Sequence, residues 1–352
     1  MKPELERLCA AYIANRDEIR KAFRWEDNAV HSVCANIFCA CGSKADADRL
    51  KACRKVIKKH TRPFSRFRGK VRTFLSCMLS LGNDPDERMT LANDYYRLLR
   101  HEFKGTEYLV LAAFLLTELT ENRLTEEQVA RGKEIFHLMN SRHRFLTNNT
   151  DSVFAMLLAY SGKSGDELIC EMESCYKLLK TRFSGSGEMQ TVSQVLSMAS
   201  GTPEEKAQRV IDLYDALLEA DVRYGRSSEM APLAALSLAD TPVSVLVEEI
   251  KSAYEFLAAG KEYGSKDADK EQRAMHAVMI VSDQYAGTRH VNSTVMTNTL
   301  EMLFAKQKAS RVSLLLHALE FAGKIIAESK EHAEKTETGT SDAAGTDQPG
   351  KE

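Results

Sequence analysis

A dense run of basic residues near the N-terminus is the strongest candidate for chemistry in this sequence. Between positions 49 and 72 there are eleven lysines and arginines, and no Asp or Glu follows until Asp84. This basic block comprises Arg49, Lys51, Arg54, Lys55, Lys58, Lys59, Arg62, Arg66, Arg68, Lys70 and Arg72. Phe64 and Phe67 lie among the cations. Cations neutralise phosphates and aromatic rings stack on bases, so the pattern is typical of a surface for nucleic acid, another polyanion or an acidic protein.

The basic block also has a plainer interpretation. Runs of like charge often form a solvated face, or pair with acidic residues elsewhere in the same molecule. The whole chain has 352 residues and a formal charge of −2, so it is not built to coat a polyanion over its entire surface. Both interpretations of the block stay open at this point.

A second group of reactive side chains comprises His31, Cys34, Cys39 and Cys41, with Cys53 twelve residues further on. Thiolate and imidazole ligands at such density could hold zinc or an iron–sulfur cluster. No CxxC pair is present, however, and helical spacing turns Cys39 away from the face shared by the other three residues of the group. We therefore expect a packed helix with small apolar thiols, and neither a metal nor another cofactor.

A third group consists of polar loops that precede short apolar helices. They cover residues 104–107, 184–188, 225–229 and 264–267, and they hold equivalent places in successive repeats. Helix N-termini on one shared edge could bind an anion or a peptide terminus. The alternative is that these loops are only turns and helix caps.

Familiar catalytic motifs are absent, so we expect no catalytic residues and lean against an enzyme. Gly162-Lys163-Ser164 resembles the end of a phosphate-binding loop, but a helix precedes it where a strand is required. An enzyme remains the second alternative, with polar residues that converge only in space. Its candidate residues are Glu134, His137, Arg142 and His143.

A repeat of about 40 residues positions all of these groups. Helix starts of the capping-box type occur at Asp84, Thr125, Ser164 and Thr202, with a looser copy at Thr241, in steps of 38 to 41 residues. Long amphipathic helices are predicted over 85–101, 126–142, 165–182, 203–220 and 242–260. Short apolar helices are predicted over 71–81, 108–119, 152–160, 191–199 and 230–239. A period of this length is typical of stacked helical hairpins.

The chain divides into three predicted parts. Residues 1–65 form a helical cap, residues 66–333 form the repeat array, and residues 334–352 form a disordered tail rich in Gly, Thr and Asp. The charged N-terminus lacks a signal-peptide core, and no apolar run is long enough for a membrane span. Eight scattered cysteines are typical of free thiols in a reducing compartment. We therefore expect a cytoplasmic protein.

Three segments carry a resemblance to a known family: 63–69 (PFSRFRG), 107–114 (EYLVLAAF) and 151–158 (DSVFAMLL). With the later Ser-x-x-Met or Leu helices, they resemble an uncharacterised family typical of Gram-positive bacteria that carries only a domain-of-unknown-function label. The resemblance covers nearly the whole chain except the tail. It implies a bacterial cytosolic helical protein and supplies no site residues.

The sequence thus predicts an all-α fold of helical hairpins, an α-solenoid similar to HEAT repeats, curved or compacted into a superhelix. The preferred function is a non-enzymatic scaffold or adaptor that binds a protein or peptide. The first alternative is a binder of nucleic acid or another polyanion through the basic block.

Overall fold

Within the residues that the structure describes, all regular secondary structure is helical. The computed structural model describes residues 1–26, 28–119, 123–142, 147, 151–199, 201–226, 229–260 and 270–285. The longer, outer helices of these ranges are α1 (Pro3–Ala22), α3 (Ala47–His60), α5 (Pro85–Leu99), α7 (Glu126–Arg142), α9 (Gly165–Lys180), α11 (Pro203–Glu219) and α13 (Val243–Ala259). The inner helices are α2 (Asn28–Ala40), α4 (Arg72–Leu81), α6 (Glu107–Leu119), α8 (Asp151–Leu158), α10 (Ser186–Met198), α12 (Met230–Ser237) and α14 (Lys270–Tyr285). One 3-10 turn, η1 (Arg66–Arg68), precedes α4.

Side-chain caps fix where the outer helices begin. The hydroxyl oxygens of Ser164 and Thr202 accept from the backbone N–H of Glu167 and Glu205, and each Glu carboxylate accepts in return from the backbone N–H of the capping residue. Such reciprocal bonds satisfy N–H groups that have no partner inside the helix. The looser copy of the motif behaves differently, because α13 begins at Val243 without a side-chain cap.

The two layers differ in how they bury their residues. All eight residues of α8 and all eight of α12 are buried. Outer helices bury one face only; α11, for example, buries Val210, Leu213, Tyr214 and Leu217 at spacings of three and four. None of the helices in the described ranges is both long enough and apolar enough to cross a bilayer.

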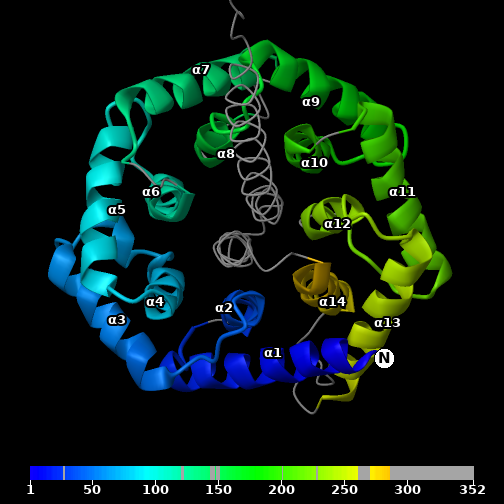
Figure 1. Cartoon of the computed structure of the whole chain (residues 1–352), viewed down its shortest axis with the longest axis horizontal. Coiled ribbons are helices and arrows are strands. Elements are labelled where there is room, and N and C mark those ends of the chain that lie inside the picture. The colour runs from blue at the N-terminus through cyan, green and yellow to red at the C-terminus, as the bar shows by residue number, and fades with distance from the viewer. Residues whose placement is uncertain are drawn as a thin grey trace, which may run out of the picture.

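The helical hairpins close into a ring (Figure 1). The outer helices run around the circumference, and the inner helices are seen nearly end-on inside them. Helix α1 packs against both α13 and α14, and α2 packs against α14, so the first hairpin meets the last of the described hairpins. The all-α fold of helical hairpins is therefore confirmed, whereas the stack closes on itself and does not form an open superhelix.

Residues of the first and last hairpins join the two ends of the described chain. The Glu249 carboxylate on α13 is buried and lies 2.5 Å from the Lys2 ammonium. It also accepts from the Tyr285 hydroxyl at 2.7 Å and from the Gln284 amide at 3.3 Å. Between α1 and α14, the ring centroids of Tyr12 and His276 are 6.0 Å apart. The closure thus combines an ion pair with an aromatic contact.

The inner helices all point the same way around the first three hairpins. Arg88 at the start of α5 donates to the Met78 carbonyl near the end of α4 (3.1 Å) and to the Thr117 hydroxyl near the end of α6 (3.3 Å). At the opposite end, the Glu26 carboxylate before α2 accepts from the hydroxyl of Thr73 in the first turn of α4 at 2.7 Å. The starts of α2, α4 and α6 therefore lie at one end of the ring, which we call the N-terminal end.

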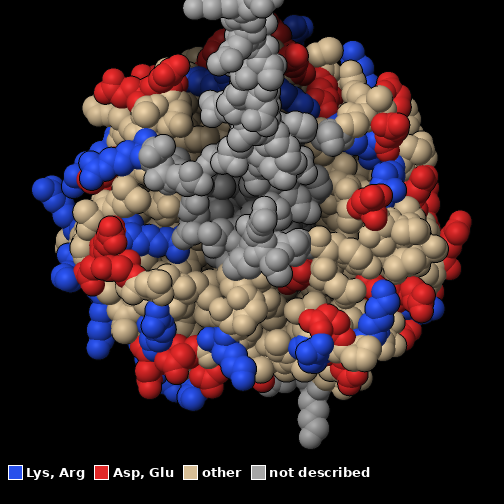
Figure 2. Space-filling view, in the orientation of Figure 1, with Lys and Arg blue, Asp and Glu red and all other residues tan. Residues whose placement is uncertain are grey.

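Cations of the outer layer cap the other end of the inner helices. Arg49 donates to carbonyl oxygens at the end of α4, Lys206 at the end of α10 and Arg209 at the end of α12. Arg209 makes three such bonds, at 2.6, 2.7 and 3.0 Å. Carbonyl oxygens at a helix end lack internal partners and carry partial negative charge, so the cations stabilise these ends. Figure 2 shows acidic and basic side chains intermingled around the rim of the face that it views.

Most predicted elements agree with the structure to within two or three residues. The larger difference is α10, which begins at Ser186 and not at residue 191, because its first turn is polar and contains Gly187. The predicted cap, residues 1–65, contains α1, α2 and α3. Helices α1 and α2 pair in the same outer–inner order as the later hairpins. The last part of the predicted repeat array, from residue 286, and the predicted disordered tail lie outside the described residues.

We expect Glu249→Ala to weaken the closure of the ring. The change removes the acceptor of the Tyr285 hydroxyl and the partner of Lys2, so the free energy of unfolding should fall by about 2 kcal/mol. Urea denaturation followed by circular dichroism measures this change. Glu4→Ala is the control, because Glu4 pairs with Arg7 on the exposed face of α1 and should cost less than about 0.5 kcal/mol. Equal losses in the two variants would contradict a role for Glu249 in closure.

We also expect a pH dependence of stability from His276. Burial, with a smaller contribution from the Arg16 charge, lowers the pKa of His276 from 6.5 to about 3. The folded protein therefore keeps His276 neutral, whereas the unfolded chain takes up a proton as the pH falls below about 6.5. The free energy of unfolding should decline between about pH 6.5 and 3. The slope with pH should approach that expected when the unfolded chain binds one more proton than the folded protein.

Denaturation series at several pH values test this expectation. His276→Leu should reduce the slope of the free energy of unfolding with pH by up to the contribution of one bound proton. His101→Leu, at an exposed position, should leave it unchanged. An unaltered slope in His276→Leu would show that His276 already titrates normally in the folded protein.

Candidate anion-binding site

A basic cleft lies where α6 begins, at the N-terminal end of the ring. Its volume is about 390 Å³, and its lining comprises Arg66, Lys70, Lys104, Gly105, Thr106, Glu107 and Tyr108. Two of these cations belong to the basic block, and the third comes from the loop 104–107. The structure thus brings together two groups of residues that are separate in the sequence.

Local packing holds the basic block against α6. The ring of Phe67 is buried and meets Tyr96 edge-on, with centroids 5.4 Å apart. The backbone N–H of Lys70 donates to the Glu107 carboxylate at 3.1 Å. Gly69 permits this approach, because a Cβ there would lie 1.9 Å from a Glu107 carboxylate oxygen. The positions of Arg66 and Lys70 beside the cleft therefore follow from a buried aromatic residue and a glycine.

The cleft has a strongly positive environment. The side chains of Arg66, Lys70 and Lys104 are exposed, and within the described residues none of them makes a hydrogen bond or an ion pair. The Arg100 guanidinium lies against Gly105, since a Cβ there would be 2.1 Å from one of its nitrogens. Burial raises the pKa of Tyr96, while the charges of Arg100 and Arg66 act in the opposite direction.

The start of α6 adds to this positive potential. Helix α6 has 13 residues, and the N-terminal end of a helix carries partial positive charge with unpaired N–H groups. The Thr106 hydroxyl accepts from the backbone N–H of Leu109 at 3.3 Å, so one of these groups is already satisfied. The Glu107 carboxylate is the acidic group of the cleft. Such an arrangement can bind an anion, and Glu107 can accept from a donor on the same ligand.

Much of the basic block has partners elsewhere in the molecule. Arg49 caps α4, and Arg68 donates to the Thr61 hydroxyl at 3.0 Å at the end of α3. Arg54 contacts Glu26 at 3.0 Å and lies 4.1 Å from the centroid of the Phe23 ring. These three arginines serve the fold.

The other members of the block lie nearer the surface. Lys51 pairs with Asp48 at 3.1 Å, and Lys59 pairs with Asp86 at 2.6 Å. Lys55, Lys58 and Arg62 are exposed, whereas Arg72 is half-buried at the start of α4. The block therefore does not form one continuous surface. Its two aromatic residues also differ, because Phe67 is buried and Phe64 is fully exposed.

The His31 and cysteine group is divided among different neighbours. The His31 imidazole lies 3.0 Å from the Phe23 carbonyl oxygen, and Cys34 lies beside Cys77. Cys39 accepts from the Asn15 amide at 3.6 Å. Burial raises the pKa of Cys34 and Cys39 well above the ordinary value for a thiol, which disfavours metal-binding thiolates. In the part of the chain that the structure describes, no three His, Cys, Asp or Glu side chains gather closely enough to hold a metal ion.

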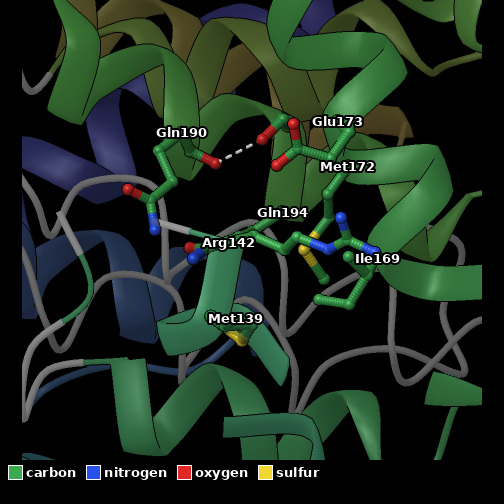
Figure 3. A pocket seen from close by; sticks show the side chains of 8 residues that line it. Met139, Arg142, Ile169, Met172, Glu173, Gln190 and Gln194 are labelled. Atoms are coloured by element: carbon green, nitrogen blue, oxygen red, sulfur yellow. Dashed lines mark hydrogen bonds between the residues drawn. The ribbon is translucent and has the colours of Figure 1, made fainter. Parts of the chain in front are cut away.

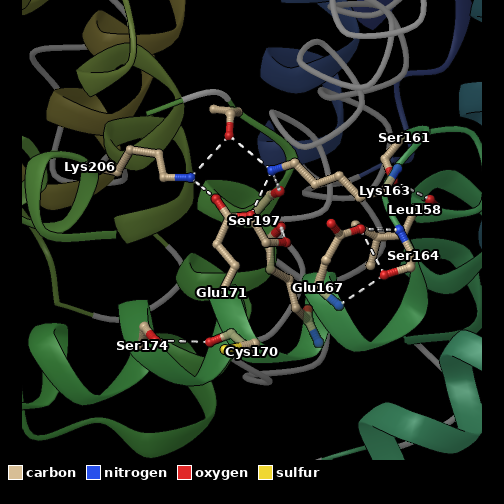
Figure 4. A network of polar contacts seen from close by, with 12 residues as sticks. Leu158, Ser161, Lys163, Ser164, Glu167, Cys170, Glu171, Ser174, Ser197 and Lys206 are labelled. Carbon is tan, nitrogen blue, oxygen red and sulfur yellow. Dashed lines mark hydrogen bonds and ion pairs between the residues drawn. The ribbon is translucent and has the colours of Figure 1, made fainter. Parts of the chain in front are cut away.

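Lys163 of the apparent phosphate-loop motif belongs to a structural network (Figure 4). Its ammonium lies 2.6 Å from the Glu171 carboxylate and donates to the Ser197 carbonyl at 2.9 Å. Lys206, which is almost fully buried, pairs with the same carboxylate and donates to the Ala199 carbonyl at 3.0 Å. The network thus joins α9 and α11 to the end of α10. Glu171 and Lys206 carried no signal in the sequence, because their contacts span about one repeat.

A smaller cavity lies between α7, α9 and α10 (Figure 3). Gln190 and Gln194 line it from α10, with Arg142 from α7 and Glu173 from α9. The Gln194 amide N–H donates to Asp151 at 3.2 Å, whereas the amide oxygens of both glutamines are buried without a hydrogen-bond partner in the described structure. A volume of about 10 Å³ suits a single water. It does not suit a substrate.

The candidate catalytic residues of the enzyme alternative do not all lie at this cavity. Arg142 lines it, whereas Glu134 and His137 are exposed on α7. His143 lies outside the described residues.

The remaining inner-helix loops have internal bonds. Lys180 donates to the Ser184 carbonyl, and the Tyr224 hydroxyl donates to the Glu229 carbonyl at 2.5 Å. The loop 264–267 lies outside the described residues. Among the described loops of this group, 104–107 is the one that adjoins the exposed cations of the basic block.

Comparison with known proteins gives a family but no activity. A family model described as "Protein of unknown function (DUF4003)" matches residues 15–309. Over 316 residues the chain is 21% identical to the uncharacterized protein YeaA of Bacillus subtilis strain 168. This alignment covers 87% of this chain and 93% of that protein. No solved structure matches significantly. The resemblance to a bacterial family of unknown function is thereby confirmed.

We expect Glu171→Gln to destabilise the fold by about 3 kcal/mol. The change leaves the buried Lys206 ammonium without a counter-charge, and such uncompensated charges are costly. Asp48→Asn provides a matched control, because Asp48 pairs with Lys51 in water and should cost less than about 0.5 kcal/mol. Chemical denaturation measures both values. A loss for Glu171→Gln as small as that of the control would mean that the network contributes little.

Proposed function

The chain belongs to the DUF4003 family, whose function is unknown, and we propose that it binds a phosphate-bearing ligand in the basic cleft at the start of α6. One observation carries the proposal. Three cations from two separate segments, Arg66, Lys70 and Lys104, converge on a cleft of about 390 Å³ without a partner among the described residues. Cations elsewhere in the ring, such as Arg49 and Arg209, instead cap helix ends.

The chemistry of the lining favours phosphate. The Arg66 guanidinium offers a planar pair of donors that matches two phosphate oxygens, and the lysines add point charges. The α6 N-terminus contributes further N–H groups and a favourable dipole. A carboxylate ligand would use the same donors, but three cations suit the higher charge of a phosphate better.

The size and composition of the cleft favour a small ligand or headgroup. A volume of about 390 Å³ lies near the lower end of the range typical of small-molecule sites, roughly 300–1,000 Å³. Glu107 can accept from a hydroxyl or amine of the ligand, and Tyr108 supplies an aromatic wall. We assign a binding role, because cations and hydrogen-bond donors for an anion predominate in the lining.

The scaffold alternative is less favoured by the architecture. Peptide-binding solenoids use an open concave surface. In this chain α1 meets α13 and α14, so the inner helices face a closed ring. We place the ligand in the cytoplasm, since the cysteines of the described residues are all free thiols and fit a reducing compartment.

Calorimetric titration with inorganic pyrophosphate tests the proposal. The triple variant Arg66→Ala, Lys70→Ala, Lys104→Ala should bind at least 100-fold more weakly, because each charge-assisted hydrogen bond contributes roughly tenfold in affinity. The control is Lys51→Ala, Lys55→Ala, Lys58→Ala, which removes equal charge from the exposed side of α3 and should change affinity less than about threefold. Equal weakening of both variants would indicate nonspecific attraction and overturn the cleft as the site.

A further inference from the structure

Two aromatic side chains project into solvent at the N-terminal end of the ring. Phe64 is 100% exposed and Trp25 is 87% exposed. No other Phe, Trp or Tyr in the described ranges is exposed. Large apolar side chains that gather on one exposed surface often mark a binding site.

The loops that carry Trp25 and Phe64 lie next to each other. Trp25 precedes Glu26, whose carboxylate accepts from Thr73 in the first turn of α4 at 2.7 Å. Phe64 lies in the loop that leads into α4, two residues before Arg66 of the cleft. Both rings therefore project from loops that enter successive inner helices, and the segment that carries Phe64 also supplies Arg66 and Lys70 to the cleft.

The cleft and the loops of the two rings carry several exposed cations. They are Arg24, Arg62, Arg66, Lys70, Arg100 and Lys104. Two of the acids nearby are already bonded, since Glu26 contacts Arg54 at 3.0 Å and Glu107 accepts from the Lys70 backbone at 3.1 Å. Glu102 is exposed among the cations. The surface therefore combines a positive charge with two apolar projections.

We propose that this surface docks on an anionic lipid bilayer. Phe64 and Trp25 enter the boundary between headgroups and acyl chains, while Arg66, Lys70 and Lys104 contact headgroup phosphates. This inference rests on the proposed function, because the cleft that binds phosphate is the one that receives the headgroup. Stable attachment requires two signals, and here an apolar insertion accompanies a polybasic patch.

The exposure of the rings favours a bilayer over single-stranded nucleic acid. A stacking platform presents rings along a groove that follows the nucleic-acid backbone. Phe64 retains its full exposure and so forms no wall of the cleft, and one face of the Trp25 ring is covered by Arg24, at 4.9 Å from the ring centroid. Projecting rings flanked by arginine instead match the membrane interface, where aromatic and basic side chains are enriched.

The single tryptophan of the chain provides a direct readout. Vesicles of phosphatidylcholine with about 30% phosphatidylglycerol should shift the Trp25 emission to shorter wavelength, whereas pure phosphatidylcholine vesicles should not, because the cations need anionic headgroups. Co-sedimentation measures affinity in parallel. Phe64→Ala should weaken vesicle binding about tenfold, whereas Leu218→Ala, at another exposed apolar residue on α11, should leave it unchanged.

Pyrophosphate titration of the same variants separates the two proposals. Phe64→Ala should bind pyrophosphate with the affinity of the unmodified chain. The triple variant of Arg66, Lys70 and Lys104 should lose affinity for both pyrophosphate and anionic vesicles. Equal vesicle affinity of Phe64→Ala and the unmodified chain would overturn the docking proposal, as would an emission shift with single-stranded DNA but not with vesicles. Vesicle binding without pyrophosphate binding would overturn the phosphate cleft on which the docking rests.

Discussion

The contact of α1 with α13 and α14 is the constraint on which the rest of the structure depends. Inner helices such as α8 and α12 are buried on all sides, and a helix of this kind must be covered all round. An open stack would leave its first and last inner helices without a neighbour. Closure removes these ends, since α2 packs against α14, and Glu249 joins the N-terminal segment to the last hairpin. The ring therefore needs no specialised terminal unit.

Closure also gives the ring two different ends. Where neighbouring inner helices point the same way, their C-terminal carbonyl oxygens gather at one end and their N-terminal N–H groups at the other. Lysines and arginines from the outer layer satisfy the carbonyl oxygens, as Arg209 does for α12. Arg49 and Arg209 lie on the outer helix of the same hairpin as the inner helix that they cap, whereas Lys206 on α11 caps α10 of the preceding hairpin. The exposed cations of the cleft, Arg66, Lys70 and Lys104, lie at the opposite end.

Local sequence signals predicted the elements well and the arrangement poorly. Capping boxes at Ser164 and Thr202 mark helix starts correctly because they act within four residues. Ring closure depends on a contact between Lys2 and Glu249, which no local pattern encodes. The same limit applies to the cleft. Arg66 and Lys70 stood out as part of a basic run and Lys104 as part of a loop, but their meeting depends on the burial of Phe67 and on the space beside Gly69.

The exposed cations of the cleft lie beside the positive end of the α6 dipole, where Glu107 is the acid of the first turn, and a bound anion would stabilise this arrangement. Acidic residues are favoured in the first turn of a helix, as at Asp151 in α8 and Glu188 in α10. Helices α2 and α4 have no acid there, and α4 begins with Arg72. Positive side chains beside positive helix ends repel one another in the folded state. A bound phosphate would relieve this repulsion for Arg66, Lys70 and Lys104 together, so the folded protein and its ligand should stabilise each other.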